Sequence, residues 1–187
     1  MSKKVVLIVI DMQVGLFEAA PRHDAEHVVE RINALSRTVR AVGCNVIFIQ
    51  HDDEPGYLLE PGSEGWQILP ALEREADDIV VRKKACDAFY ETELQDVLDR
   101  YDPSPLIVTG CATDFCVDTS VRAAASRDFD VVVVEDGHTT ADRPHLDAAA
   151  IIEHHNWLWK NLILPRSQVR VLPTQELLEQ LSGRETG

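Results

Sequence analysis

The sequence predicts an α/β fold: a three-layer, doubly wound arrangement in which a parallel sheet of about six strands has helices on both faces. Two observations predict it. Short apolar runs rich in valine and isoleucine alternate along the chain with segments of helical periodicity, as expected when helices connect parallel strands. Three runs, at residues 5–10, 46–49 and 131–134, are apolar throughout, which is typical of strands buried on both faces.

Six short segments have the residue types of strands. The first of them is expected at the centre of the sheet and the last at an edge. In chain order, the predicted strands are residues 5–10, 46–49, 78–82, 106–108, 131–134 and 169–172.

The predicted helices have apolar residues at every third or fourth position. The clearest begins at Asp24, which can cap it, and is ended by Gly43. Thr92 and Thr174 are expected to cap two later helices. The predicted helices are residues 24–42, 66–72, 91–100, 120–125, 143–159 and 174–181. No linker, repeat or low-complexity tract interrupts this order, so residues 1–187 are expected to form one domain.

Composition restricts the possible partners. The chain has 18 Lys and Arg against 32 Asp and Glu, a net charge of −14, which disfavours nucleic acids and anionic membrane surfaces. No apolar run approaches the length of a membrane span, and the run at residues 5–10 is too short for a signal peptide. We therefore expect a cytoplasmic protein with a small-molecule substrate, whose four cysteines are thiols rather than disulfides or zinc ligands.

The segment at residues 106–126 has the pattern of a strand, a tight turn and a helix. Such a turn places a side chain at the carboxyl end of a parallel sheet. Thr113 or Asp114 can cap the helix, which places Cys116 in its first turn. The positive end of the helix dipole would stabilise a thiolate there and lower the thiol pKa, so Cys116 is a candidate nucleophile. The alternative is that Cys116 is a small apolar residue between helix and sheet.

Other polar residues also follow predicted strands, where ligands bind in such sheets. They are Asp11, the cluster His51/Asp52/Asp53, Lys83 or Lys84, and Asp136. An aspartate can take the thiol proton, and a lysine can stabilise both anions, so that sulfur attacks a carbonyl and forms a thioester. Equally, Asp11 and Asp136 could be turn residues and the lysines solvated charges.

The chain resembles the isochorismatase-like cysteine hydrolases, from the strand before Asp11 to about residue 156. The segment 108–117, VTGCATDFCV, is similar to the nucleophile turn of that family, and residues 83–94 to its lysine segment. The resemblance implies Cys116 as nucleophile, Asp11 as general base and Lys83 as catalytic lysine, with Lys84 as the alternative. It also implies a cis peptide bond between Cys111 and Ala112, an oxyanion hole from the backbone N–H groups of Ala112 and Cys116, and a homo-oligomer (dimer or tetramer).

Two departures from the family bear on substrate and cofactor. Gln50 stands where nicotinamidases have the aspartate of an Asp-x-His metal motif, so we expect no metal and no other cofactor, and a substrate other than nicotinamide. A metal held by the cluster His51/Asp52/Asp53 is the alternative. True isochorismatases lack the nucleophilic cysteine, so Cys116 favours a small amide or carbamoyl substrate.

Aromatic side chains could line the pocket, although each could equally be ordinary core. The candidates are Phe17, Trp66, Phe89 and Phe115. His154 and His155 could form a subunit contact or pack in the core. Two rival functions remain open: hydrolysis of another bond type at this site, and a thiol sensor in which Cys86 or Cys111 resolves an oxidised Cys116.

Overall fold

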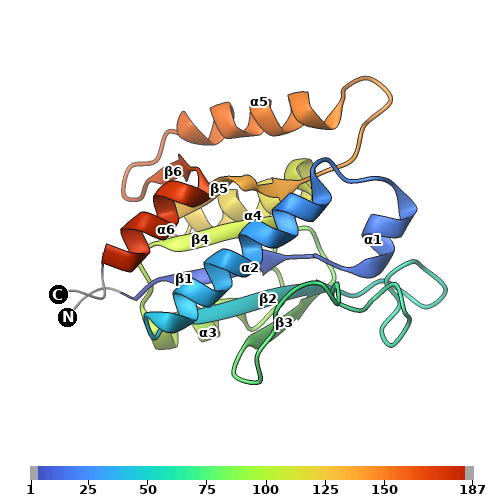
Figure 1. Cartoon of the computed structure of the whole chain (residues 1–187), viewed down its shortest axis with the longest axis horizontal. Coiled ribbons are helices and arrows are strands. Elements are labelled where there is room, and N and C mark those ends of the chain that lie inside the picture. The colour runs from blue at the N-terminus through green and yellow to red at the C-terminus, as the bar shows by residue number, and fades with distance from the viewer. Residues whose placement is uncertain (1–3, 184–187) are drawn as a thin grey trace.

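The computed structural model describes residues 4–183 and contains a six-stranded parallel sheet (Figure 1). The strand order is β3-β2-β1-β4-β5-β6, so β1 is central and β6 is an edge strand, as predicted. The order reverses direction between β1 and β4, which defines the switch point of a doubly wound sheet. The strands are β1 Val6–Ile10, β2 Asn45–His51, β3 Ile79–Lys83, β4 Leu106–Cys111, β5 Val131–Thr139 and β6 Val169–Leu172.

Helices cover both faces of the sheet, which confirms the three-layer prediction. In Figure 1, α2 (Ala25–Ala41) and α6 (Thr174–Ser182) lie side by side on the near face. The opposite face is covered by α3 (Leu94–Tyr101), α4 (Asp118–Ala125) and α5 (Ala148–Lys160). Side chains of β1 alternate between the two cores, because successive residues of a strand point to opposite faces. Two short helices, α1 (Val14–Ala19) and the π-helix η1 (Thr113–Val117), follow β1 and β4.

Several predicted boundaries and caps were wrong. Residues 66–72 form turns and an isolated bridge instead of a helix. The helix predicted from residue 143 begins at Ala148, because the side chain of Asp147 caps it by accepting a hydrogen bond from Ala150 N–H. Asp24 does not cap α2, since its carboxylate binds His27 and Arg31 instead.

At the last helix, Thr174 is the first helical residue rather than the cap. Its backbone N–H and hydroxyl both donate to the carboxylate of Asp136, at 2.9 and 2.7 Å. Asp136 is therefore a structural residue at the start of α6, in agreement with the turn alternative. Thr92 does accept a hydrogen bond from Leu94 N–H, at 3.2 Å, at the start of α3.

A glycine allows the two central strands to approach at the switch point. Gly110 on β4 has a φ of +123°, and a Cβ added there would lie 2.2 Å from the carbonyl oxygen of Ile10 on β1. Only glycine fits such an approach, because any other residue would clash with backbone that cannot move aside. The contact sets the carboxyl ends of β1 and β4 side by side, and these ends carry Asp11 and the turn to Cys116.

No helix within residues 4–183 is both long and apolar enough to cross a lipid bilayer.

Candidate active site

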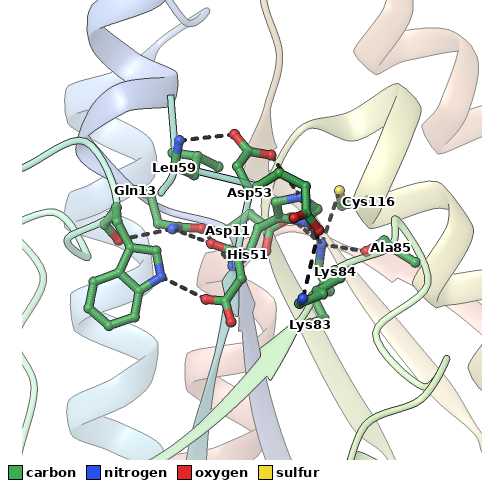
Figure 2. Close-up of polar contacts among 12 residues, drawn as sticks. Asp11, Gln13, His51, Asp53, Leu59, Lys83, Lys84, Ala85 and Cys116 are labelled. Carbon is green, nitrogen blue, oxygen red and sulfur yellow. Dashed lines mark hydrogen bonds and ion pairs between the residues drawn. The ribbon is translucent and has the colours of Figure 1, made fainter. Parts of the chain in front are cut away.

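Three of the predicted residues converge at the carboxyl ends of the strands (Figure 2). The ammonium nitrogen of Lys83 lies 2.7 Å from a carboxylate oxygen of Asp11 and 3.3 Å from the sulfur of Cys116. The positions of the three residues relative to the strands explain why their side chains lie close together. Asp11 follows β1, Lys83 ends β3, and Cys116 lies in η1 after β4. All three side chains therefore lie at the carboxyl ends of the parallel strands.

Lys83 is the centre of the cluster, and its side chain is fully buried. Besides Asp11 and Cys116, its ammonium donates to the carbonyl of Ala85 at 2.9 Å and contacts Nδ1 of His51 at 3.1 Å. Burial alone would lower the pKa of Lys83, but the negative charge of Asp11, with a further contribution from the Cys116 sulfur, outweighs it and raises that pKa. Lys83 is therefore a fixed cation.

Lys84 lies outside this cluster. Its side chain is 72% exposed and its ammonium is 3.8 Å from Glu54, at the surface. The structure thus places Lys83, the first choice of the sequence analysis, at Cys116.

Asp11 presents one free oxygen to the site. One carboxylate oxygen is paired with Lys83, while the other, Oδ1, is buried and has no hydrogen-bond partner among the described residues. A buried carboxylate oxygen without a donor is costly, and such groups in native structures commonly have a functional reason. Asp11 itself has a left-handed backbone with φ of +47°. The free oxygen is available to accept a proton.

The pKa of Cys116 is raised, contrary to the predicted direction. Burial and then the negative charge of Asp11 raise the pKa of Cys116, whereas the charge of Lys83 lowers it without reversing the result. We predicted a lowered pKa from the position in the first helical turn. A neutral thiol beside a free carboxylate oxygen fits general-base activation during attack rather than a preformed thiolate.

The turn that carries Cys116 is held by contacts that the sequence did not reveal. Thr113 and Asp114 do not cap the helix as predicted. The hydroxyl of Thr113 lies 2.9 Å from Nδ1 of His138, whose Nε2 lies 3.0 Å from the side-chain oxygen of Asn156. Asp114 instead forms a two-point ion pair with Arg143, at 2.8 and 2.9 Å. These contacts fix the π-helix η1 to β5, to α5 and to the segment between them.

His138 makes the stability of the protein depend on pH. Burial lowers its pKa to about 4, from the ordinary 6.5. Between pH 6.5 and 4 the unfolded chain binds a proton at His138 that the folded chain does not, so stability falls as pH falls, by about 3 kcal/mol in total. We expect urea unfolding at pH 7, 5.5 and 4.5 to show this loss. His138→Gln should lack it, while exposed His154→Gln should retain it. Equal pH dependence in wild type and His138→Gln would contradict the assignment.

A pocket of about 300 Å³ opens above Cys116. Asp11, Cys116 and Ala112 form part of its wall. The carbonyl of Ala112 accepts the N–H groups of Phe115 and Val117, both at 3.1 Å, so these two donors are already used. The peptide bond between Cys111 and Ala112 is cis, as the resemblance implied.

Of the four predicted aromatic residues, only Phe115 lines this pocket, where it is 52% exposed. Phe17 packs against the core beneath α2, and Phe89 is buried beside Phe129 on the other face. The indole N–H of Trp66 donates to Asp52 at 2.8 Å, away from the pocket. These three side chains therefore do not line the cavity beside Cys116, because the path of each loop decides which aromatic side chain faces it.

The side chains of the cluster His51/Asp52/Asp53 point in two different directions. His51 faces Lys83 through Nδ1 and Asp53 through Nε2, at 3.1 and 3.3 Å (Figure 2). Asp52 points the other way, to Arg82 at 2.7 Å. Within residues 4–183, no group of three or more His, Cys, Asp or Glu side chains has an arrangement suited to a metal ion.

Several pocket residues were missed by the sequence analysis. Arg22 and Arg143 line the pocket, and so do Leu16 and Leu59. They lie in loops and in the first short helix, where no periodicity or motif marks a residue as inward-facing. Gln13, which is buried, exchanges two hydrogen bonds with the backbone of His51, at 2.8 and 2.9 Å, and so ties β2 to the turn after Asp11.

The remaining thiols and histidines lie as follows. Cys86 and Cys111 both line the pocket; Cys86 is exposed, and burial raises the pKa of Cys111 to about 12. A thiol with so high a pKa is a poor resolving group.

The two adjacent histidines lie on α5. His154 is exposed, and His155 packs beside Trp159.

Comparison with known proteins agrees with this fold. A profile of the Isochorismatase domain matches residues 5–157. The streptothricin hydrolase of Streptomyces noursei is 35% identical over 141 residues, covering 74% of this chain and 55% of that protein. The chain therefore spans about half the length of this relative. The ureidoacrylate amidohydrolase RutB of Methylorubrum extorquens is 27% identical over 183 aligned positions, covering 78% of this chain and 74% of that protein.

A crystal structure of an isochorismatase family protein superposes with a TM-score of 0.81 at 30% identity, covering 90% of this chain and 99% of the other. The resemblance drawn from the nucleophile turn is thus confirmed. The chain belongs to the isochorismatase family of hydrolases.

Proposed function

We propose that the protein is a cysteine amidohydrolase that cleaves a small amide or carbamoyl compound through a thioester, with Asp11, Lys83 and Cys116 as a catalytic triad. The observation that carries the proposal is the convergence of these three side chains beside a pocket of about 300 Å³. The relatives named for hydrolysis of streptothricin and ureidoacrylate support the same class of reaction.

In the first half of the reaction, Asp11 accepts the thiol proton as the Cys116 sulfur bonds to the substrate carbonyl carbon. The backbone N–H groups of Ala112 and Cys116 are the proposed donors to the resulting oxyanion. When the tetrahedral species collapses, the C–N bond breaks and the proton passes from Asp11 to the leaving nitrogen. The products are ammonia or an amine and an acyl thioester.

In the second half, Asp11 takes a proton from water while the water oxygen attacks the thioester carbonyl. The C–S bond then breaks, the proton returns to the sulfur, and the acid leaves. The Lys83 ammonium remains charged throughout, because its partners raise its pKa. Its role is to hold the carboxylate of Asp11 in place through their ion pair and to stabilise the sulfur anion as it forms and departs.

An assay of ammonia release from a panel of small amides and carbamoyl compounds tests the proposal. We expect turnover of at least one class, and an acyl-enzyme adduct on the Cys116 peptide in quenched samples by mass spectrometry. Matched esters and vinyl ethers in the same panel test the rival bond types. Release of ammonia without an adduct, and undiminished in Cys116→Ala, would contradict a thioester route.

We further propose that the protein acts in the cytoplasm as a homo-oligomer. All four cysteines are free thiols in the structure, which is typical of a reducing compartment. Trp157 on the outer face of α5 is 64% exposed, a large apolar surface that a subunit contact would bury. Light scattering of the purified protein checks the oligomeric state.

A further inference from the structure

The pocket contains two arginines with different electrostatic surroundings. The guanidinium of Arg143 is matched by the carboxylate of Asp114 in a two-point ion pair. Arg22 has no such partner: within residues 4–183 no carboxylate lies within ion-pair distance of it. Its charge is therefore available to a molecule in the pocket.

Arg22 is held in place although nothing neutralises it. Its Nε donates to the carbonyl of Leu16 at 2.8 Å, which uses one edge of the guanidinium and leaves the terminal nitrogens free. The next residue, His23, is bound to the end of β5 by two hydrogen bonds, from its N–H to Thr140 at 2.9 Å and from Thr139 to its carbonyl at 2.6 Å. A fixed, half-buried arginine with free donors is preorganised to bind an anion.

The other charged side chains of the pocket are either paired with an opposite charge or lie away from Arg22. Asp11 is paired with Lys83, and Arg143 with Asp114. Asp53 follows β2 and faces His51, whereas the chain next to Arg22 is anchored to the end of β5 through the backbone of His23. In the sheet β2 and β5 lie on opposite sides of β1 and β4, which carry Asp11 and the turn to Cys116. The pocket thus has a basic end beyond β5 and an acidic end beyond β2, with the reactive sulfur between them.

The charge of Arg22 also affects Cys111, another residue that lines the pocket. Cys111 ends β4 directly before Ala112. Burial raises the pKa of the Cys111 thiol, and the positive charge of Arg22 opposes this increase more strongly than any other charged group that affects the thiol. The guanidinium is therefore close to the wall beside which the scissile group must lie.

From this arrangement we propose that the substrate carries a carboxylate, which Arg22 binds at the β5 end of the pocket while the amide carbonyl lies at Cys116. The inference rests on the proposed amidohydrolase function and narrows its substrate class. One unmatched positive charge suits a monoanionic carboxylate better than a phosphate dianion. The guanidinium of Arg143, 5.1 Å from the ring centre of Phe115, and that ring form the adjoining wall.

Binding to a variant that cannot turn over tests the proposal apart from catalysis. The probes are three matched pairs, malonamate with malonamide, succinamate with succinamide, and glutaramate with glutaramide, in which a carboxylate replaces one amide. With Cys116→Ala, we expect calorimetry to show that the best carboxylate binds about 10- to 100-fold more tightly than its diamide, the range for a charge-assisted hydrogen bond.

Adding Arg22→Gln should remove this preference, so that each carboxylate and its diamide bind within about threefold of one another, while Arg22→Lys should retain part of the preference. The matched control is Arg166→Gln, which removes an equal charge from an exposed site at Asp128 and should change nothing. Equal affinities within every pair, a preference that survives Arg22→Gln, or no binding by any carboxylate would each overturn the proposal.

The two proposals fail in different ways. If the carboxylates bind through Arg22 but wild-type protein releases no ammonia from any amide, the amidohydrolase function is wrong and the anion site stands. If neutral amides are hydrolysed and carboxylates are not preferred, the function stands and the role of Arg22 is wrong.

Discussion

Replacing Cys116 with serine is expected to lower kcat for ammonia release by about 10³-fold or more, with the fold unchanged. A serine hydroxyl is far harder to deprotonate than a thiol, and the proposed base, Asp11, has a single buried carboxylate oxygen without a hydrogen-bond partner to take the proton. The substitution is close to isosteric, and Cys116 is only partly buried, so the expected change in unfolding free energy is within about 1 kcal/mol.

Steady-state kinetics and thermal unfolding of the same preparation check this expectation. The matched control is Cys86→Ser, because Cys86 lines the same pocket but is exposed and does not contact Lys83 in the structure. Cys86→Ser should retain turnover within a fewfold. If Cys116→Ser is as active as wild type, or if Cys86→Ser loses activity to the same extent, Cys116 is not the nucleophile.

Removal of Lys83 is expected to damage both stability and chemistry. Lys83→Ala leaves the carboxylate of Asp11 buried without its partner, and loss of one member of a buried ion pair typically costs about 3–5 kcal/mol. The pKa of Cys116 should rise further, because the Lys83 charge is what opposes the effect of burial. The rate of Cys116 alkylation by iodoacetamide should therefore shift to higher pH, and turnover should fall steeply.

Urea unfolding and the pH profile of alkylation, measured on the Cys116 peptide, test these two effects separately. Lys83→Met, which nearly preserves side-chain volume, serves as a second variant if alanine prevents folding. Lys84→Ala is the control: its exposed ammonium lies 3.8 Å from Glu54, and its loss should change unfolding free energy by about 0.5 kcal/mol or less. An alkylation profile that stays in place in both Lys83 variants would contradict the role of this lysine.

The sheet and the meeting of the three reactive groups were predictable from sequence because they follow from topology. An apolar run such as residues 5–10 is typical of a central strand, and parallel strands bring residues at their carboxyl ends together. Asp11, Lys83 and Cys116 are far apart in the chain, but each directly follows, ends or lies one turn beyond a strand. Their proximity thus required no knowledge of side-chain packing.

The features that were not predicted depend on packing. The direction of the Cys116 pKa was wrong because local position suggests a lowered value, whereas burial beside Asp11 dominates. The helix cap failed because Thr113 finds a better partner in His138, which is 25 residues away in the chain. Arg22 was missed because nothing in its own segment shows that its guanidinium faces the pocket.

Under the proposed mechanism, the raised pKa of Cys116 would also protect the sulfur between turnovers. Peroxides and other electrophiles react with the thiolate form of cysteine, and burial beside Asp11 raises the pKa of Cys116 and so disfavours that form. In the proposed mechanism, the same burial that requires a base for each attack would shield the sulfur from oxidation, and binding of the substrate would start the reaction.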